Sequence, residues 1–174
     1  MEPSAYFVID DLKAPFPLSA LGTRWRFFTD QVMGGVSRGS MVREDVAGRP
    51  AIRMRGDVSL ENNGGFIQIS LDLAPDEGGF DATSWKGLEI DVYGRTGDYE
   101  VRLRTAELSR PWQSYRHIFR VMPEWGTLRL PFDSFRPNRT ETPLSLSQLR
   151  RVGLLAYGKA FAADLALGGI RFYA

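Results

Sequence analysis

Ser37 lies in the segment Gly35-Val36-Ser37-Arg38-Gly39, which has the G-x-S-x-G pattern of a hydrolase nucleophile elbow. Such a serine needs a strand, a turn and a helix around it, and an Asp and a His later in the chain. The residues after Ser37 favour a strand, and the only histidine, His117, lies in another strand-like run. We therefore do not expect a serine hydrolase, and we interpret His117 as a structural residue.

Glu89 and Asp91 are two residues apart on an expected strand, so both carboxylates share one face, about 6.5–7 Å apart. That separation could serve glycoside hydrolysis. We favour the alternative that they pair across strands with Arg102 and Arg104. Neighbouring guanidinium groups lower the pKa of a carboxyl group, whereas a catalytic acid needs a raised pKa. The sequence thus predicts a protein that is not an enzyme.

A Gly-Gly pair after Met33, between two strand-like runs, provides backbone freedom and room for another segment to approach closely. The flanking Asp and Ser can bind backbone amides of the turn. We expect a shaped binding loop that docks against a second Gly-Gly pair. Its candidate residues are Asp30, Met33, Gly34, Gly35, Ser37, Gly64, Gly65 and Phe66.

A second candidate site is the solvent-exposed face of one sheet. Tyrosine rings and planar guanidinium groups suit sugars, carboxylates or a protein partner. An ordinary charged sheet surface remains the alternative reading. The candidate residues are Tyr93, Arg102, Arg104, Trp112 and Tyr115.

Composition narrows the class of protein. The chain has 174 residues, no cysteine and a formal net charge of +1, which predicts one domain over 1–174 and does not suggest a nucleic-acid or membrane partner. The absence of cysteine excludes disulfides and zinc–thiolate sites, and no dense acidic loop indicates calcium, so we expect no metal and no cofactor. The start of the chain, Met1-Glu2-Pro3-Ser4, has no features of a targeting peptide, and we expect a cytoplasmic protein.

The elements that position these residues are expected to be strands. Short runs with alternating apolar residues, separated by turns rich in Gly and Pro, indicate an all-β sandwich or jelly roll. Helical turns are expected only at Leu18–Leu21 and Ser147–Arg151. The expected strands are Tyr6–Ile9, Gly39–Val42, Ala51–Arg55, Phe66–Leu71, Leu88–Tyr93, Tyr99–Arg104, Tyr115–Val121, Gly126–Leu130, Arg151–Ala156 and Ala166–Phe172.

Several motifs in their order along the chain resemble the family of complex I intermediate-associated proteins. The resemblance covers about 25–172. The motifs are Trp25, Asp30-x-Val32-Met33-Gly34-Gly35-x-Ser37, Gly56-x-Val58-Ser59-Leu60, Gly64-Gly65-Phe66, Tyr115-x-x-x-Phe119 and Leu130-Pro131-Phe132-x-x-Phe135-x-Pro137.

The resemblance implies a β-sandwich of the galactose-binding-like type, similar to carbohydrate-binding modules, and a role in assembling a protein complex. We therefore expect a non-enzymatic binding module whose partner is another protein. The alternative is a domain that binds a carbohydrate or small ligand on a concave sheet face.

Overall fold

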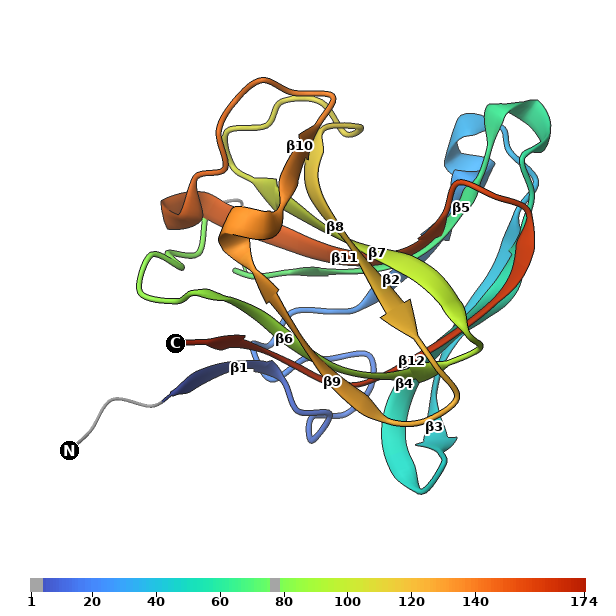
Figure 1. The fold of residues 1–174 in the computed structure, drawn as a ribbon, viewed down its shortest axis with the longest axis horizontal. Coiled ribbons are helices and arrows are strands. Elements are labelled where there is room, and N and C mark those ends of the chain that lie inside the picture. Colours follow the sequence, from blue (N-terminus) through green and yellow to red (C-terminus); the bar gives the residue numbers. More distant parts are fainter. Residues whose placement is uncertain (1–4, 76–78) are drawn as a thin grey trace.

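The computed structural model describes residues 5–75 and 79–174, which fold into two antiparallel sheets packed face to face (Figure 1). The first sheet has the strand order β3-β4-β12-β6-β9, with β1 paired to β12. Its strands are β1 (Tyr6–Asp10), β3 (Arg38–Val46), β4 (Arg49–Val58), β6 (Gly87–Gly94), β9 (Gly126–Pro131) and β12 (Phe161–Tyr173).

The second sheet has the strand order β10-β8-β7-β11-β5-β2. Figure 1 shows it bending upward at both ends, so that its outer face lies on the inside of the bend. Its strands are β2 (Arg26–Thr29), β5 (Phe66–Asp72), β7 (Gly97–Thr105), β8 (Ser114–Val121), β10 (Arg136–Asn138) and β11 (Leu149–Tyr157).

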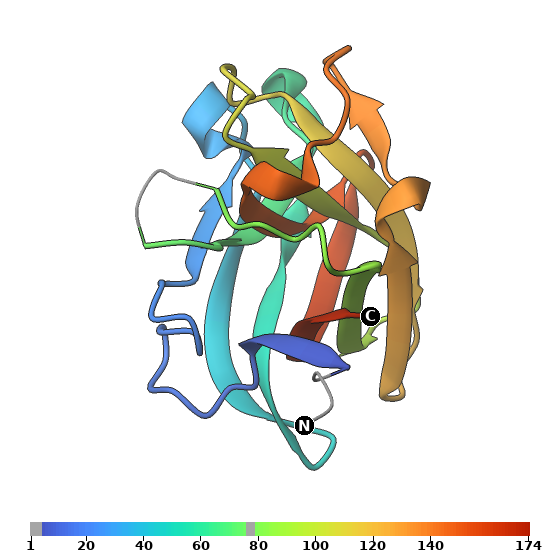
Figure 2. The same cartoon turned by 90° about the vertical axis from the view of Figure 1, so that its left-hand side faces the viewer.

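One hydrophobic core fills the space between the sheets. Alternation along the strands sends Leu88 and Ile90 of β6 toward Val101 and Leu103 of β7, and all four are fully buried. Figure 2, turned by 90°, shows the two layers and places β1 beside the end of β12, where Tyr6 pairs with Tyr173. The expected all-β sandwich of the jelly-roll type is confirmed.

Each of the ten expected strands corresponds to a strand of the structure, and two further strands, β2 and β10, were not expected. Short 3-10 helices are η1 (Asp30–Met33), η2 (Glu61–Asn63), η3 (Phe132–Ser134) and η4 (Leu146–Gln148). The expected helical turn at Ser147–Arg151 is mostly wrong, because η4 ends at Gln148 and β11 begins at Leu149. The one at Leu18–Leu21 is wrong, because Leu18 forms an isolated bridge with Arg24.

Candidate binding site

Asp30 joins the two glycine-containing segments of the candidate loop. Its carboxylate is fully buried and accepts hydrogen bonds from Ser37 N (2.9 Å) and Ser37 Oγ (2.5 Å). It also accepts hydrogen bonds from Gly65 N (2.6 Å) and Phe66 N (3.3 Å). The expected contact between the Asp30–Ser37 segment and the Gly64–Phe66 segment is therefore present, with a buried carboxylate at its centre.

The glycines of this loop leave space for that carboxylate. A Cβ atom added at Gly35 or at Gly64 would overlap the Asp30 side chain. Gly34 ends η1 in the left-handed conformation, with a φ of +87° that favours glycine. The loop conformation thus depends on packing at two glycines and on backbone geometry at the third.

Two opposing effects act on the pKa of Asp30. Burial alone would raise the pKa, but the hydrogen bonds from Ser37, Gly65 and Phe66 together outweigh burial and lower it. The carboxylate is therefore ionised at neutral pH and fully occupied by donors of its own chain. Asp30 and Ser37 hold the loop together and are not exposed to a partner.

The Asp30–Ser37 loop and the neighbouring segment before η2 expose apolar side chains to solvent. Exposed fractions are 72% for Val32, 64% for Met33, 50% for Leu60 and 38% for Val36. We call these four residues the apolar tip. Of the residues predicted for this site, Met33 and Gly34 are exposed here. Val32, Val36 and Leu60 were missed, although apolar residues beside loop glycines were visible in the sequence.

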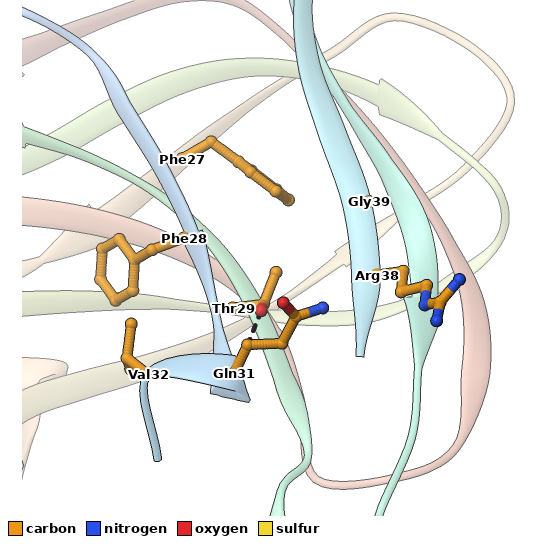
Figure 3. Close-up of a pocket in the computed structure, with 7 residues that line it drawn as sticks. All are labelled: Phe27, Phe28, Thr29, Gln31, Val32, Arg38 and Gly39. Atoms are coloured by element: carbon orange, nitrogen blue, oxygen red, sulfur yellow. Dashed lines mark hydrogen bonds between the residues drawn. The ribbon is translucent and has the colours of Figure 1, made fainter. Parts of the chain in front are cut away.

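A hollow of about 440 Å³ lies beside the apolar tip, between β2 and the start of β3 (Figure 3). In Figure 3 Phe27 points toward the strand that carries Gly39, while Phe28 and Val32 lie on the other side of β2. A Cβ atom at Gly39 would lie 3.2 Å from the Phe27 ring, so that ring packs against the bare backbone of β3. The hollow therefore opens between one edge strand of each sheet.

A row of paired residues crosses all six strands on the outer face of the second sheet and contains four arginines. Residues paired across neighbouring strands lie on the same face, and the pairing runs Arg26, Ser70, Gly153, Arg102, Arg116, Arg136 from β2 to β10. We call its four arginines the arginine row. In Figure 1 the loops 106–113 and 139–148 rise at one end of this face, and η1 and η2 rise at the other.

Ion pairing on this face is incomplete. Its acidic residues are each in use: Glu100 pairs with Arg102 (2.9 Å) and Arg116 (3.7 Å), Asp72 with Arg151 (2.7 Å), and Asp98 with Arg120 (3.3 Å). Within residues 5–75 and 79–174, no carboxylate pairs with the three remaining arginines of the face. These are Arg26, Arg104 and Arg136.

Two tyrosines predicted for this face are elsewhere. Tyr93 belongs to β6 of the first sheet, where it packs 5.6 Å from the ring of Trp125. Tyr115 is fully buried, and its hydroxyl donates to Thr142 O (2.7 Å). The prediction of one surface containing all five residues is therefore wrong for both tyrosines, because β6 is in the other layer and Tyr115 occupies a core position of β8.

The other three residues predicted for the face lie on it or at its rim. Arg102 and Arg104 are on β7, and Trp112 is 53% exposed in the loop 106–113. Arg104 Nη1 donates to Arg110 O (3.0 Å) of the same loop. Sequence reasoning missed Tyr157 of β11, whose ring lies 4.3 Å from the Arg102 guanidinium.

Glu89 and Asp91 do form cross-strand ion pairs, but not with the predicted partners. On the outer face of the first sheet, Glu89 pairs with Arg129 (2.9 Å) and Arg171 (2.5 Å). Asp91 pairs with Arg171 (2.8 Å) and Arg49 (2.7 Å). Arg102 and Arg104 are in the other sheet, which the alternation of the sequence could not reveal.

The environment of Asp91 does not suit a catalytic acid. Burial alone would raise its pKa, but hydrogen bonds from Arg171, Thr127 and Arg49 together lower it to about 2. A general acid needs the opposite shift.

Neither a metal site nor a membrane span is found in the described part of the chain. No three His, Asp or Glu side chains there gather in a way that could hold a metal ion. No helix there is long and apolar enough to cross a membrane.

Solved structures similar to this chain include several carbohydrate-binding modules. The family 11 module from Clostridium thermocellum, in complex with a β-1,3-1,4-mixed-linked tetrasaccharide, has a TM-score of 0.77 at 12% identity, covering 99% of this chain and 98% of that one. The family 30 module of a Clostridium thermocellum cellulosomal cellulase has a TM-score of 0.56 at 13% identity, covering 78% and 91%. An agarase has a TM-score of 0.65 at 10% identity, covering 98% of this chain and 25% of that one. At such identities the likeness shows the fold alone.

Among curated proteins, none matches this chain. The family model of Complex I intermediate-associated protein 30 (CIA30) matches residues 16–167. That match includes the loop around Asp30, the second Gly-Gly pair and most of both sheets. Because it spans most of the 174 residues, the chain belongs to the family of Complex I intermediate-associated protein 30.

Proposed function

We propose that this protein is a non-catalytic module that binds another protein through the apolar tip. The observation that carries the proposal is the exposure of Val32 and Met33 on the Asp30–Ser37 loop and of Leu60 on the segment beside it, with a buried carboxylate fixing the loop and the Ser59 amide donating to Ser37 Oγ. Apolar side chains gathered at the surface mark interaction sites. A loop that is already ordered loses little conformational entropy when a partner binds.

The hollow beside the tip supports the same proposal. It offers apolar walls at Phe27, Phe28 and Val32, which an apolar side chain of the partner can contact. Family membership agrees with a protein partner, because the name of the family refers to association with intermediates of complex I. We propose a role of that kind, in the assembly of a protein complex.

A capture experiment from the native host tests this proposal. The bait proteins are the wild type, a Val32→Ser/Met33→Ser variant and a Met122→Ser control, and captured proteins are identified by mass spectrometry. Met122 is also exposed, but it follows β8, which is separated from β2 by β7, β11 and β5. We expect the wild type and the control to capture the same proteins, and the double variant to lose them at an unchanged melting temperature.

Two results would overturn the proposal. One is a wild-type protein that enriches no defined partner. The other is a double variant that captures the same partners as the wild type in the same amounts.

A second candidate function is carbohydrate binding on the outer face of the second sheet. It is favoured by the exposed ring of Trp112 at the rim of that face and by the likeness of the fold to carbohydrate-binding modules. A glycan array tests it, with Trp112→Ala as the variant. Binding of a neutral glycan that this substitution abolishes would favour the second candidate.

A further inference from the structure

Arg104 is a half-buried cation without an anionic partner in the described structure. It is directly opposite Arg151 on the neighbouring strand, and like charges placed opposite each other destabilise a sheet. Arg151 is neutralised by Asp72 at 2.7 Å, whereas Arg104 only donates to the carbonyl oxygen of Arg110. Burial lowers the pKa of Arg104, and the charges of Arg151 and Arg150 lower it further.

Most arginines on the outer face of the first sheet, in contrast, form ion pairs. Five of the six arginines on its outer face have a carboxylate within 4 Å, and the sixth, Arg38, is opposite Asp57 on the neighbouring strand, so that face is largely neutralised internally. The second sheet leaves three unpaired, two at the ends of the arginine row (Arg26 and Arg136) and one beside its centre (Arg104). An arrangement of unpaired guanidinium groups across one face fits an extended anion with several carboxylates.

The centre of the row also offers a neutral donor. Gly153 has no side chain, and the amide of Gln68 occupies that space: a Cβ atom at this position would overlap Gln68 Nε2. The Gln68 side chain forms no hydrogen bond with any residue in 5–75 or 79–174. Guanidinium and amide donors are thus presented together on one face.

A guanidinium group lies over one face of each aromatic ring near the row. The Arg102 guanidinium lies 4.3 Å from the centre of the Tyr157 ring, and the Arg110 guanidinium lies 5.9 Å from that of Trp112. A sugar ring that stacks on the same face would have to displace the cation. A carboxylate needs no aromatic face and can instead bind a guanidinium group that has no ion pair, such as that of Arg104.

The row begins next to the apolar tip. Arg26 is on β2, which ends at Thr29, and η1 follows directly at Asp30. A segment that leaves the tip can therefore continue along the row without crossing the rest of the molecule. This continuity favours a protein ligand over an acidic polysaccharide.

We infer that the outer face of the second sheet binds an acidic segment of the protein partner, with Arg104 and the two ends of the arginine row, Arg26 and Arg136, holding its carboxylates. This inference rests on the proposed function, because the segment belongs to the partner that contacts the apolar tip. Arg104 binds a carboxylate directly, and Arg26 and Arg136 bind the flanking acidic residues.

Titration of the purified full chain with a labelled peptide that alternates Glu and Gly tests the inference. We expect fluorescence anisotropy to show binding of this peptide and none of the matching Gln and Gly peptide. Arg104→Gln lowers the affinity about tenfold, because one charge-assisted contact is lost. The control Arg55→Ala, which removes an exposed arginine from the first sheet, leaves the affinity unchanged.

Further variants keep the result interpretable. Arg26→Ala changes an exposed side chain and is expected to lower the affinity without lowering the melting temperature. Val32→Ser/Met33→Ser is expected to retain the peptide, since the tip is outside the row. The two proposals can fail separately. If Val32→Ser/Met33→Ser loses the captured proteins but the wild type does not bind the peptide, this inference is overturned and the proposed function stands.

Three other results would overturn the inference. The first is a wild-type protein that does not bind the acidic peptide at about millimolar concentration. The second is an equal loss of affinity in Arg55→Ala and Arg104→Gln, which would indicate unspecific attraction. The third is Arg104-dependent binding of polygalacturonate that is tighter than binding of the peptide, which would assign the face to an acidic polysaccharide.

Discussion

Asp30 is a buried charged residue that holds two segments of the chain together. Four hydrogen bonds from two separate segments end on one carboxylate, so a single side chain fixes the position of both. Removing a partner from a buried polar group costs more than the interaction itself contributes, because the remaining groups stay unsatisfied. The loop is therefore expected to respond strongly to changes at this residue.

Asp30→Asn tests this expectation. The amide keeps one acceptor oxygen but directs an NH2 group at donors, and we expect a loss of about 2–3 kcal/mol in the free energy of unfolding. The lowered pKa of Asp30 also predicts acid sensitivity. The ionised Asp30 carboxylate contributes to the free energy of unfolding fully above the unfolded-state pKa of about 3.9. This contribution is lost as the pH falls through the lower pKa of the folded state. Urea unfolding at several pH values measures both effects.

An Asp30→Asn variant as stable as the wild type at neutral pH would contradict this account. So would a variant whose stability declines in acid as steeply as that of the wild type at the same low pH. The matched control is Glu61→Gln, which removes an exposed carboxylate from the nearby helix η2.

At the scale of elements, the loop glycines act by two different mechanisms. Gly34 has a left-handed backbone, and a Cβ atom added there would meet no other atom within 4 Å, so Gly34→Ala costs only the backbone strain, about 1 kcal/mol. Gly35→Ala places a methyl group into the Asp30 carboxylate and is expected to cost about 3 kcal/mol. Chemical unfolding of both variants gives the comparison, and equal losses would contradict the assignment of the two mechanisms.

Which strands the sequence predicts depends on their length. β6 and β7 were predicted because alternation over several residues, such as Leu88, Ile90 and Val92, leaves a clear pattern. β2 and β10 have four and three residues, too few for such a pattern to stand out. β2 nevertheless carries Arg26 and positions η1, so part of the site depends on an element that the sequence did not reveal.

Alternation also leaves the assignment of a face incomplete. It separates the two sides of one strand, but it does not identify which strands share a sheet. Tyr93 and Arg102 were therefore expected together, although β6 and β7 are in different layers. Tyr115 was expected at the surface, although its ring has a core position and its hydroxyl is satisfied by Thr142. The contact between the segments around Asp30 and Gly65 was predicted correctly. Glycine pairs indicate where two backbone segments can approach closely, and an adjacent carboxylate can bind their amides.

At the scale of the whole molecule, a formal charge of +1 conceals an uneven distribution. The outer face of the first sheet pairs five of its six arginines with carboxylates, whereas the second sheet has seven arginines and three acidic residues on its outer face, and only four of those arginines are paired. Composition alone could not predict this difference, because it arises only when the strands are ordered into sheets. The field of the molecule should therefore be positive on one side.

Two double variants with the same formal charge test this distribution by cation-exchange chromatography. Arg26→Ala/Arg136→Ala removes unpaired arginines from the second sheet, and Arg55→Ala/Arg129→Ala removes paired ones from the first. We expect the former to elute at lower salt, because a surface binds through its region of highest potential and an arginine beside a carboxylate adds little to it. Elution of both variants at the same salt concentration would contradict a one-sided field and would remove the electrostatic basis for an acidic ligand on the second sheet.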